Sequence, residues 1–124
     1  MNYLGIAIGA VAGALSRYFL GILLNTFAFA VPLGTLAANL LGSLLIGFLI
    51  PLTSRHTFFP EALRLTLITG FCGSFTTFST FSAETIYLFS HEQYFWASAI
   101  ILLHVAGSLA MTFLGMHLAK LLFI

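Results

Sequence analysis

The chain has 124 residues, of which 60% are hydrophobic and 6% are charged, and its formal net charge is +1. A soluble domain needs about a quarter of its residues charged, so this composition excludes a soluble protein and indicates an integral membrane protein. The weak net charge speaks against nucleic acid as a partner, and the single cysteine, Cys72, excludes an intrachain disulfide and a multi-cysteine metal site.

Four apolar segments predict an all-α integral membrane protein with four transmembrane helices in one domain, residues 1–124. Each segment reaches the length of about 20 residues that crosses a bilayer. The first lacks the basic start and cleavage pattern of a signal peptide, so we expect it to be retained. The predicted helices cover about 3–24, 33–52, 62–89 and 95–123.

The charges give a weak orientation signal. An even number of spans places both termini on one side of the membrane, together with the loop Thr53–Pro60. That side collects Arg55, Arg64 and Lys120, which favours cytoplasmic termini by the positive-inside rule. Arg17 lies about 20 Å along the first helix, toward the other side, and offsets this bias. The sequence therefore allows insertion in either direction.

Small residues recur at helical spacing in the first two segments. Gly5, Gly9 and Gly13 repeat every four residues, and Gly42 precedes Gly47 in the second segment. Small residues let membrane helices approach closely. Four helices form a thin bundle, so we interpret these rows as a sign of contacts beyond one chain and predict an oligomer.

The third segment contains an unusual polar stretch, Thr69–Ser82 (TGFCGSFTTFSTFS). Gly73–Thr76 falls about 17–21 Å into the membrane, and glycine lowers helix propensity. We predict that the helix is broken near the midplane. The carbonyls that end its first half would then face a cation, and the amides that start the second half would favour an anion. A simple kink at small residues is the alternative.

Aromatic and hydroxyl residues alternate after this point. Phe78 and Phe81 share a helix face, and Thr77, Ser79 and Thr80 lie between and beside them. Such aromatic stripes commonly serve packing alone. The functional alternative uses the positive edges of the rings, together with hydroxyl donors, to hold a small anion weakly.

Other polar residues inside the spans extend this pattern. His104, Ser108 and Thr112 form one stripe along the fourth helix, either as helix-to-helix contacts or as an ion track. Asn39 on the second helix could ligate an anion or fix a neighbouring backbone break. Arg17 either extends to the interface or raises the anion concentration at a pore mouth. No nucleophile–base pair or phosphate loop occurs, so we do not expect an enzyme.

Together these segments resemble the Fluc/CrcB fluoride channels. The resemblance covers all four helices and rests most heavily on the core GFCG-x-x-TTFSTF. It is carried by GAVAGALSRY (Gly9–Tyr18), PLGTLAANLLGS (Pro32–Ser43), GFCGSFTTFSTFSAE (Gly70–Glu84) and HVAGSLAMT (His104–Thr112).

The resemblance implies a passive fluoride channel in the bacterial inner membrane that lowers fluoride toxicity. It implies a dual-topology antiparallel homodimer with two pores and one structural sodium ion at its centre. Backbone carbonyls of Gly73 and Thr76 would hold the sodium. The fluoride pathway would comprise Arg17, Asn39, Thr77, Phe78, Ser79, Thr80, Phe81, His104, Ser108 and Thr112. The position of His104 is often Tyr in this family.

Two other functions are considered. A small proton-coupled multidrug exporter also has four helices, but it needs a buried carboxylate, typically in the first helix, where this chain has none. A non-conducting packing subunit would use the polar stripes only as helix contacts, and would need polar partners for three helices.

Overall fold

The computed structural model describes residues 2–26, 30–55 and 59–123, without the side chain of Arg55. Its elements are α1 (Asn2–Leu24), α2 (Leu33–Arg55), α3 (Glu61–Leu65), the π-helix η1 (Thr66–Cys72), α4 (Gly73–Phe75), α5 (Phe78–Ser90) and α6 (Tyr94–Phe123). Over these residues every regular element is a helix, which confirms the all-α prediction. Parts of the expected loops Asn25–Val31 and Thr53–Pro60 lie outside the described residues.

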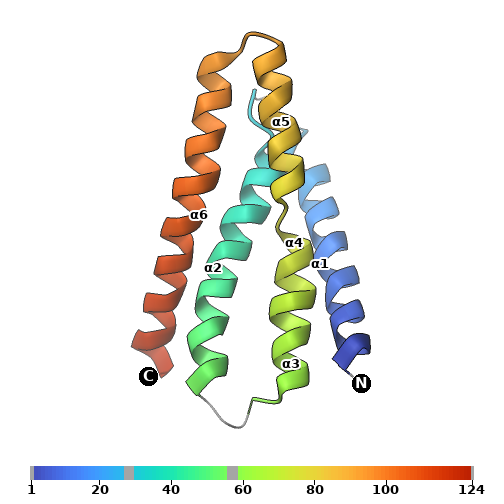
Figure 1. The fold of residues 1–124 in the computed structure, drawn as a ribbon, viewed down its shortest axis with the longest axis vertical. Coiled ribbons are helices and arrows are strands. Elements are labelled where there is room, and N and C mark those ends of the chain that lie inside the picture. Colours follow the sequence, from blue (N-terminus) through green and yellow to red (C-terminus); the bar gives the residue numbers. More distant parts are fainter. Residues whose placement is uncertain (1, 27–29, 56–58, 124) are drawn as a thin grey trace.

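The helices form four parallel and antiparallel columns, with α3, η1, α4 and α5 making up one of them (Figure 1). Both ends of the chain lie at the same end of the bundle, as expected for four spans. α1, α2 and α6 are each long and apolar enough to cross a membrane. The third column reaches that length only as a sum of shorter pieces. The α5–α6 hairpin extends beyond the ends of α1 and α2.

The break in the third column exists, and it lies at the last residue of the predicted segment Gly73–Thr76 and at the residue after it. Gly73, expected within the break, is helical with φ −62° and ψ −31°. The chain becomes extended at Thr76 (φ −83°, ψ 158°) and Thr77 (φ −152°, ψ 115°). The low helix propensity of Gly73 therefore did not determine where the helix breaks. The site described below shows that a side chain of α2 holds the extended residues.

The glycine rows, interpreted above as a sign of contacts beyond one chain, make close contacts inside one chain, and the predicted oligomer stays a prediction. A Cβ added to Gly9 would collide with the carbonyl of Thr66, and one added to Gly13 would collide with the carbonyl of Phe71. In the same way, Gly47 of α2 faces the backbone of Thr112 in α6. Gly9 and Gly13 therefore allow α1 to approach the third column closely, and Gly47 allows α2 to approach α6 closely.

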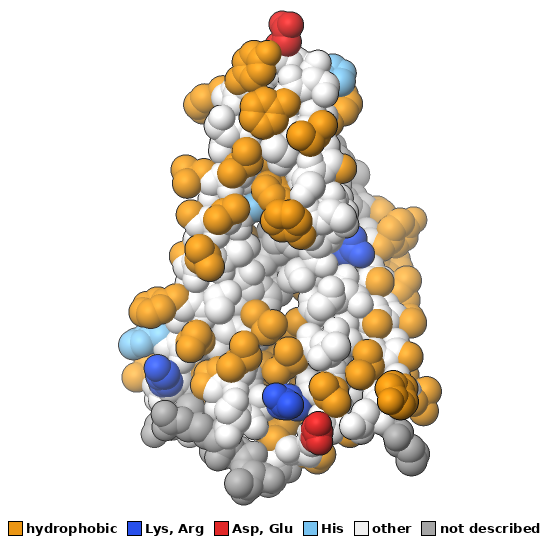
Figure 2. All heavy atoms as spheres, viewed as in Figure 1, with side chains coloured by type: hydrophobic (Ala, Val, Ile, Leu, Met, Phe, Trp, Pro, Cys, Tyr) orange, Lys and Arg blue, Asp and Glu red, His pale blue; other side chains and the backbone are white. Residues whose placement is uncertain are grey.

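The outer surface of the chain is apolar. Side chains such as Val11 on α1, and Leu102 and Phe113 on α6, are exposed, and hydrophobic side chains cover much of the face in Figure 2. Such a surface is stable only in contact with lipid or with another apolar surface. The protein is therefore a multi-pass membrane protein, and polar residues such as Thr35, Asn39 and His104 are buried inside it.

Candidate ion-binding pockets at the broken third helix

Asn39 of α2 holds the broken backbone. Its Nδ2 donates a hydrogen bond to the carbonyl of Thr77 at 3.0 Å, and its Oδ1 accepts one from the amide of Thr77 at 2.7 Å. Asn39 and Thr77 are both buried. A polar backbone group at this depth costs several kcal/mol if it is left unpaired. The Asn39 side chain stabilises the extended Thr77 by forming hydrogen bonds with its backbone groups.

The same contact frees a carbonyl on the other side of the break. In a continuous helix the amide of Thr77 would donate to the carbonyl of Gly73, but here it donates to Asn39. The amide and the hydroxyl of Thr76 both donate to Cys72, at 3.1 and 3.0 Å. The first half of the helix therefore ends with the Gly73 oxygen lacking its helical donor.

Thr77 also begins the second half. Its Oγ1 accepts from the amide of Thr80 at 3.1 Å and so caps α5. The same hydroxyl donates to Thr80 Oγ1 at 3.0 Å and lies 3.3 Å from Ser79 Oγ. Three of the hydroxyl residues singled out in the sequence therefore form one cluster at the start of α5.

His104 of α6 joins the other side of Asn39. Its Nδ1 lies 2.9 Å from Asn39 Nδ2, and its ring stacks on Phe81 with centroids 4.5 Å apart and planes at 26°. Only 4% of His104 is exposed. A connected polar chain thus runs from the break in the third column, through α2, to α6.

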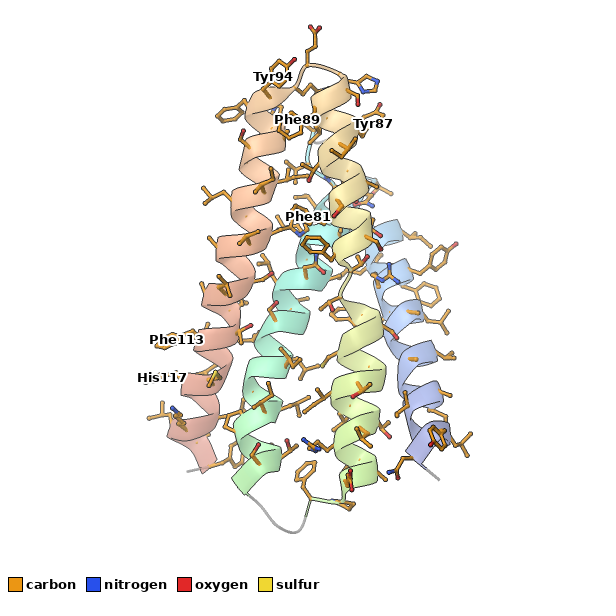
Figure 3. The ribbon with its side chains drawn as sticks, viewed as in Figure 1. Phe81, Tyr87, Phe89, Tyr94, Phe113 and His117 are labelled. Atoms are coloured by element: carbon orange, nitrogen blue, oxygen red, sulfur yellow. The ribbon has the colours of Figure 1, made fainter. Side chains whose placement is uncertain are left out.

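These groups line a pocket of about 430 Å³, here called the break pocket. Phe81 points from α5 toward α6 at this level (Figure 3). None of the described lining residues is Asp, Glu, Lys or Arg, so the polar part of the wall consists of neutral donors and acceptors. The predicted site residues that it brings together are Asn39, Gly73, Thr76, Thr77, Phe78, Phe81, His104, Ser108 and Thr112.

A second pocket, of about 500 Å³, lies on the α1 side and is here called the arginine pocket. Arg17 lines it, together with Thr77 and Thr80, and its Nε donates to the carbonyl of Ser74 at 3.2 Å. Thr77 borders both pockets. Ser79 is exposed and belongs to the lining of neither pocket.

The two phenylalanines differ sharply. Phe81 is 6% exposed, whereas Phe78 is 76% exposed. Their rings meet edge to face, with centroids 5.4 Å apart at 69°. Phe81 belongs to the interior of the chain, and Phe78 extends the pocket wall to the surface.

Two further residues were not assigned to a site from the sequence: Glu84, which lines neither of these pockets, and Cys72. Glu84 of α5, expected near an interface, is half-buried, and its Oε1 accepts from Thr35 Oγ1 at 2.5 Å. The signal was available, because Glu84 is the one carboxylate in the third apolar segment. Cys72, 1% exposed, lines the break pocket, but nothing in the sequence distinguishes it from a packing residue.

Comparison with known proteins identifies the family. Residues 4–116 match the family described as "CrcB-like protein, Camphor Resistance (CrcB)". A relative from Tolumonas auensis, named "Fluoride-specific ion channel FluC", is 49% identical over 121 residues, which cover 98% of this chain and 95% of the relative. Proteins of the same name from Pseudomonas aeruginosa and Chromobacterium violaceum are 49% and 51% identical, over 93% and 92% of this chain and 91% and 90% of those proteins. The chain belongs to the CrcB family, as the resemblance in its sequence indicated.

Proposed function

We propose that this protein is a fluoride-selective, passive ion channel. The observation that carries the proposal is the break pocket, a cavity between membrane helices whose described lining offers hydroxyl, amide, imidazole and ring-edge groups without a formal charge. The names of the similar proteins support fluoride as the ion.

The chemistry of the lining suits fluoride. The ion is small and strongly hydrated, so a pore has to replace much of its water shell. The hydroxyl of Ser108 and the ring edges of Phe78 and Phe81 can do this through several weak contacts. The hydroxyl of Thr112 donates to the carbonyl of Ser108 at 2.9 Å and would join them by exchanging that hydrogen bond. A fixed cation in the lining would hold the ion more tightly, whereas weak, multiple sites allow it to leave. Arg17, in the neighbouring arginine pocket, would attract anions toward the entrance.

We infer further that two copies assemble as an antiparallel, dual-topology homodimer. Phe78 is 76% exposed beside a polar pocket, and a second copy would cover it. Gly73 is a second argument for an interface at this surface, because a Cβ there would meet only the carbonyl of Ile68 at 3.8 Å. Nothing within the described chain therefore crowds Gly73, which leaves room for close approach from outside.

The break is also suited to one structural sodium ion per dimer. The carbonyl of Gly73 lacks its helical donor, and Thr76 is extended; such oxygens at the end of a broken helix are typical sodium ligands in membrane proteins. Two carbonyls are too few to surround a hard cation. A second copy would supply the matching pair, and bound sodium would add positive charge near the pathway.

In the cell, the channel would sit in the bacterial inner membrane and lower cytoplasmic fluoride. Hydrogen fluoride crosses the bilayer, ionises in the more alkaline cytoplasm and accumulates there as the ion. A passive pathway lets fluoride leave down its gradient without ATP or a coupled ion.

The test is ion efflux from liposomes that contain only the purified protein. We expect rapid release of fluoride and retention of chloride, recorded with electrodes selective for each ion. Protein-free liposomes are the control for leakage. Equal release of both ions, or release of neither, would sink the assignment.

One observation favours a proton-coupled exporter as a second candidate. Glu84 is half-buried between spans and bonded to Thr35, as a proton-carrying carboxylate would be. That function predicts uptake of lipophilic cations driven by a pH gradient and abolished by Glu84→Gln. A channel predicts that fluoride efflux proceeds at equal pH on both sides.

A further inference from the structure

The imidazole of His104 has one nitrogen whose role is not explained by the fold. Its Nε2 is buried and makes no hydrogen bond with any residue in the described part of the chain. The side chain lines the break pocket. A buried N–H without an acceptor costs about 1–3 kcal/mol, so the state of this nitrogen matters for what the pocket can bind.

The backbone of Thr77 fixes which way the Asn39 amide points. The amide of Thr77 can only donate, so the atom 2.7 Å from it must be Oδ1 of Asn39. The carbonyl of Thr77 can only accept, so the atom 3.0 Å from it must be Nδ2. A flipped Asn39 side chain is excluded, because it would place Nδ2 against the amide of Thr77, donor against donor, and Oδ1 against the carbonyl of Thr77, acceptor against acceptor.

This orientation fixes the tautomer of His104. Asn39 Nδ2 faces His104 Nδ1 at 2.9 Å, and an amide NH₂ group has no acceptor. Nδ1 must therefore be the unprotonated nitrogen. In a neutral imidazole the proton then lies on Nε2, which is the atom without a partner.

We propose that Asn39 is a positioning residue that locks His104 as the Nε2–H tautomer, and that this N–H is a fixed donor to the fluoride ion in the break pocket. The stack on Phe81 holds the plane of the ring. Unlike a hydroxyl, the locked ring cannot turn to offer a lone pair to a cation. This inference rests on the proposed function and names the atom that confers part of its selectivity.

Nuclear magnetic resonance of protein labelled with ¹⁵N-histidine tests the lock without any transport measurement. The His104 signals are those lost in His104→Phe. We expect wild-type His104 to show an unprotonated Nδ1 and a proton bonded to Nε2. In Asn39→Asp, whose carboxylate can only accept, the proton should move to Nδ1. A wild-type proton on Nδ1 overturns the inference, whatever the variant shows.

Fluoride efflux from liposomes tests the donor with a matched pair of variants. His104→Asn reaches only to the position of Nδ1, keeps an acceptor for Asn39 and lacks the outer donor. His104→Gln reaches to the position of Nε2 and ends in N–H groups. Because one hydrogen bond to a charged group is lost, we expect the Asn variant to be slower than the Gln variant by about tenfold.

The outcomes separate this inference from the proposed function. If wild-type protein releases no fluoride, the channel assignment fails. If wild type conducts and the two variants conduct equally, at whatever level, the donor role of Nε2 fails while the channel assignment stands. If gel filtration shows that a variant does not assemble in detergent, the wild-type spectrum alone tests the inference: a proton on Nε2 supports it, and a proton on Nδ1 overturns it.

Discussion

Asn39 binds both backbone polar groups of Thr77, with its oxygen 2.7 Å from the amide nitrogen and its nitrogen 3.0 Å from the carbonyl oxygen. The two residues are 38 positions apart. A single side chain of α2 thus replaces the helical acceptor that the Thr77 amide loses at the break.

Replacing Asn39 by Ala should destabilise the protein more than an ordinary change of a membrane helix. The amide of Thr77 would be left buried and unpaired, at a cost of about 1–3 kcal/mol, and its carbonyl, which caps α5, would lose the hydrogen bond from Asn39. We expect a lower temperature of aggregation in detergent, measured by gel filtration after heating. Leu40→Ala, the next position on α2, is the control for loss of side-chain volume. Equal behaviour of the two variants would show that Asn39 does not hold the break.

Phe81→Ile and Phe78→Ile should both reduce fluoride efflux, because each removes a ring edge from the pathway. The two should differ in stability. Phe81 is buried and stacked on His104, so its loss should lower the thermal stability of the single chain. Phe78 is exposed on one chain, so its loss should spare the fold. If an assembled Phe81→Ile protein released fluoride at the normal rate, the ring of Phe81 would serve packing only.

Gly9→Ala should destabilise the bundle, whereas Gly21→Ala on the same helix should be tolerated. A Cβ at Gly9 meets the backbone of Thr66, which cannot move aside, but a Cβ at Gly21 meets only Asn25 Nδ2 at 3.7 Å. Overpacking of this kind costs about 1–3 kcal/mol. Thermal stability in detergent measures the difference. A reversed order would contradict the close packing of α1 on η1.

The dual topology predicts that one loop is reached from both sides of the membrane. Thr26 is exposed at the end of α1, and Thr26→Cys in a Cys72→Ala background gives a single thiol. In sealed vesicles a membrane-impermeant maleimide should label about half of the protein, and the rest only after permeabilisation. Complete labelling before permeabilisation, or none, would rule out antiparallel insertion.

Long apolar runs predicted three helices, α1, α2 and α6, that are each long and apolar enough to cross a membrane. The third apolar segment is divided into shorter elements. Local propensity placed the break over Gly73–Thr76, and the structure places it at the end of that segment, at Thr76 and Thr77. The position depends on Asn39, and a contact between residues so distant in sequence is invisible to propensity. Asn39 itself was recognised as a residue able to fix a break, but its partner could not be identified.

The glycine rows also show that a sequence does not identify which residues lie in contact. Their spacing indicated close helix contacts, and such contacts exist, but the sequence could not say with which helix. Gly9 and Gly13 face η1 within the same chain. Similarly, Arg17 was expected either to extend to the interface or to lie at a pore mouth, and its hydrogen bond to Ser74 could be seen only once α1 lay beside the third column.

The π-helix η1, between Thr66 and Cys72, has a consequence for how the third span should be compared and redesigned. A π-turn holds one residue more than an α-turn, so everything after it is rotated by about 100° relative to a regular helix. A helical wheel drawn straight through the span would assign Phe78 and Phe81 to the wrong sides. Deleting one residue within η1 would leave the composition almost unchanged, yet it would turn Thr77 away from Asn39. The direction in which Thr77 and the residues after it face is therefore determined by η1, earlier in the same span.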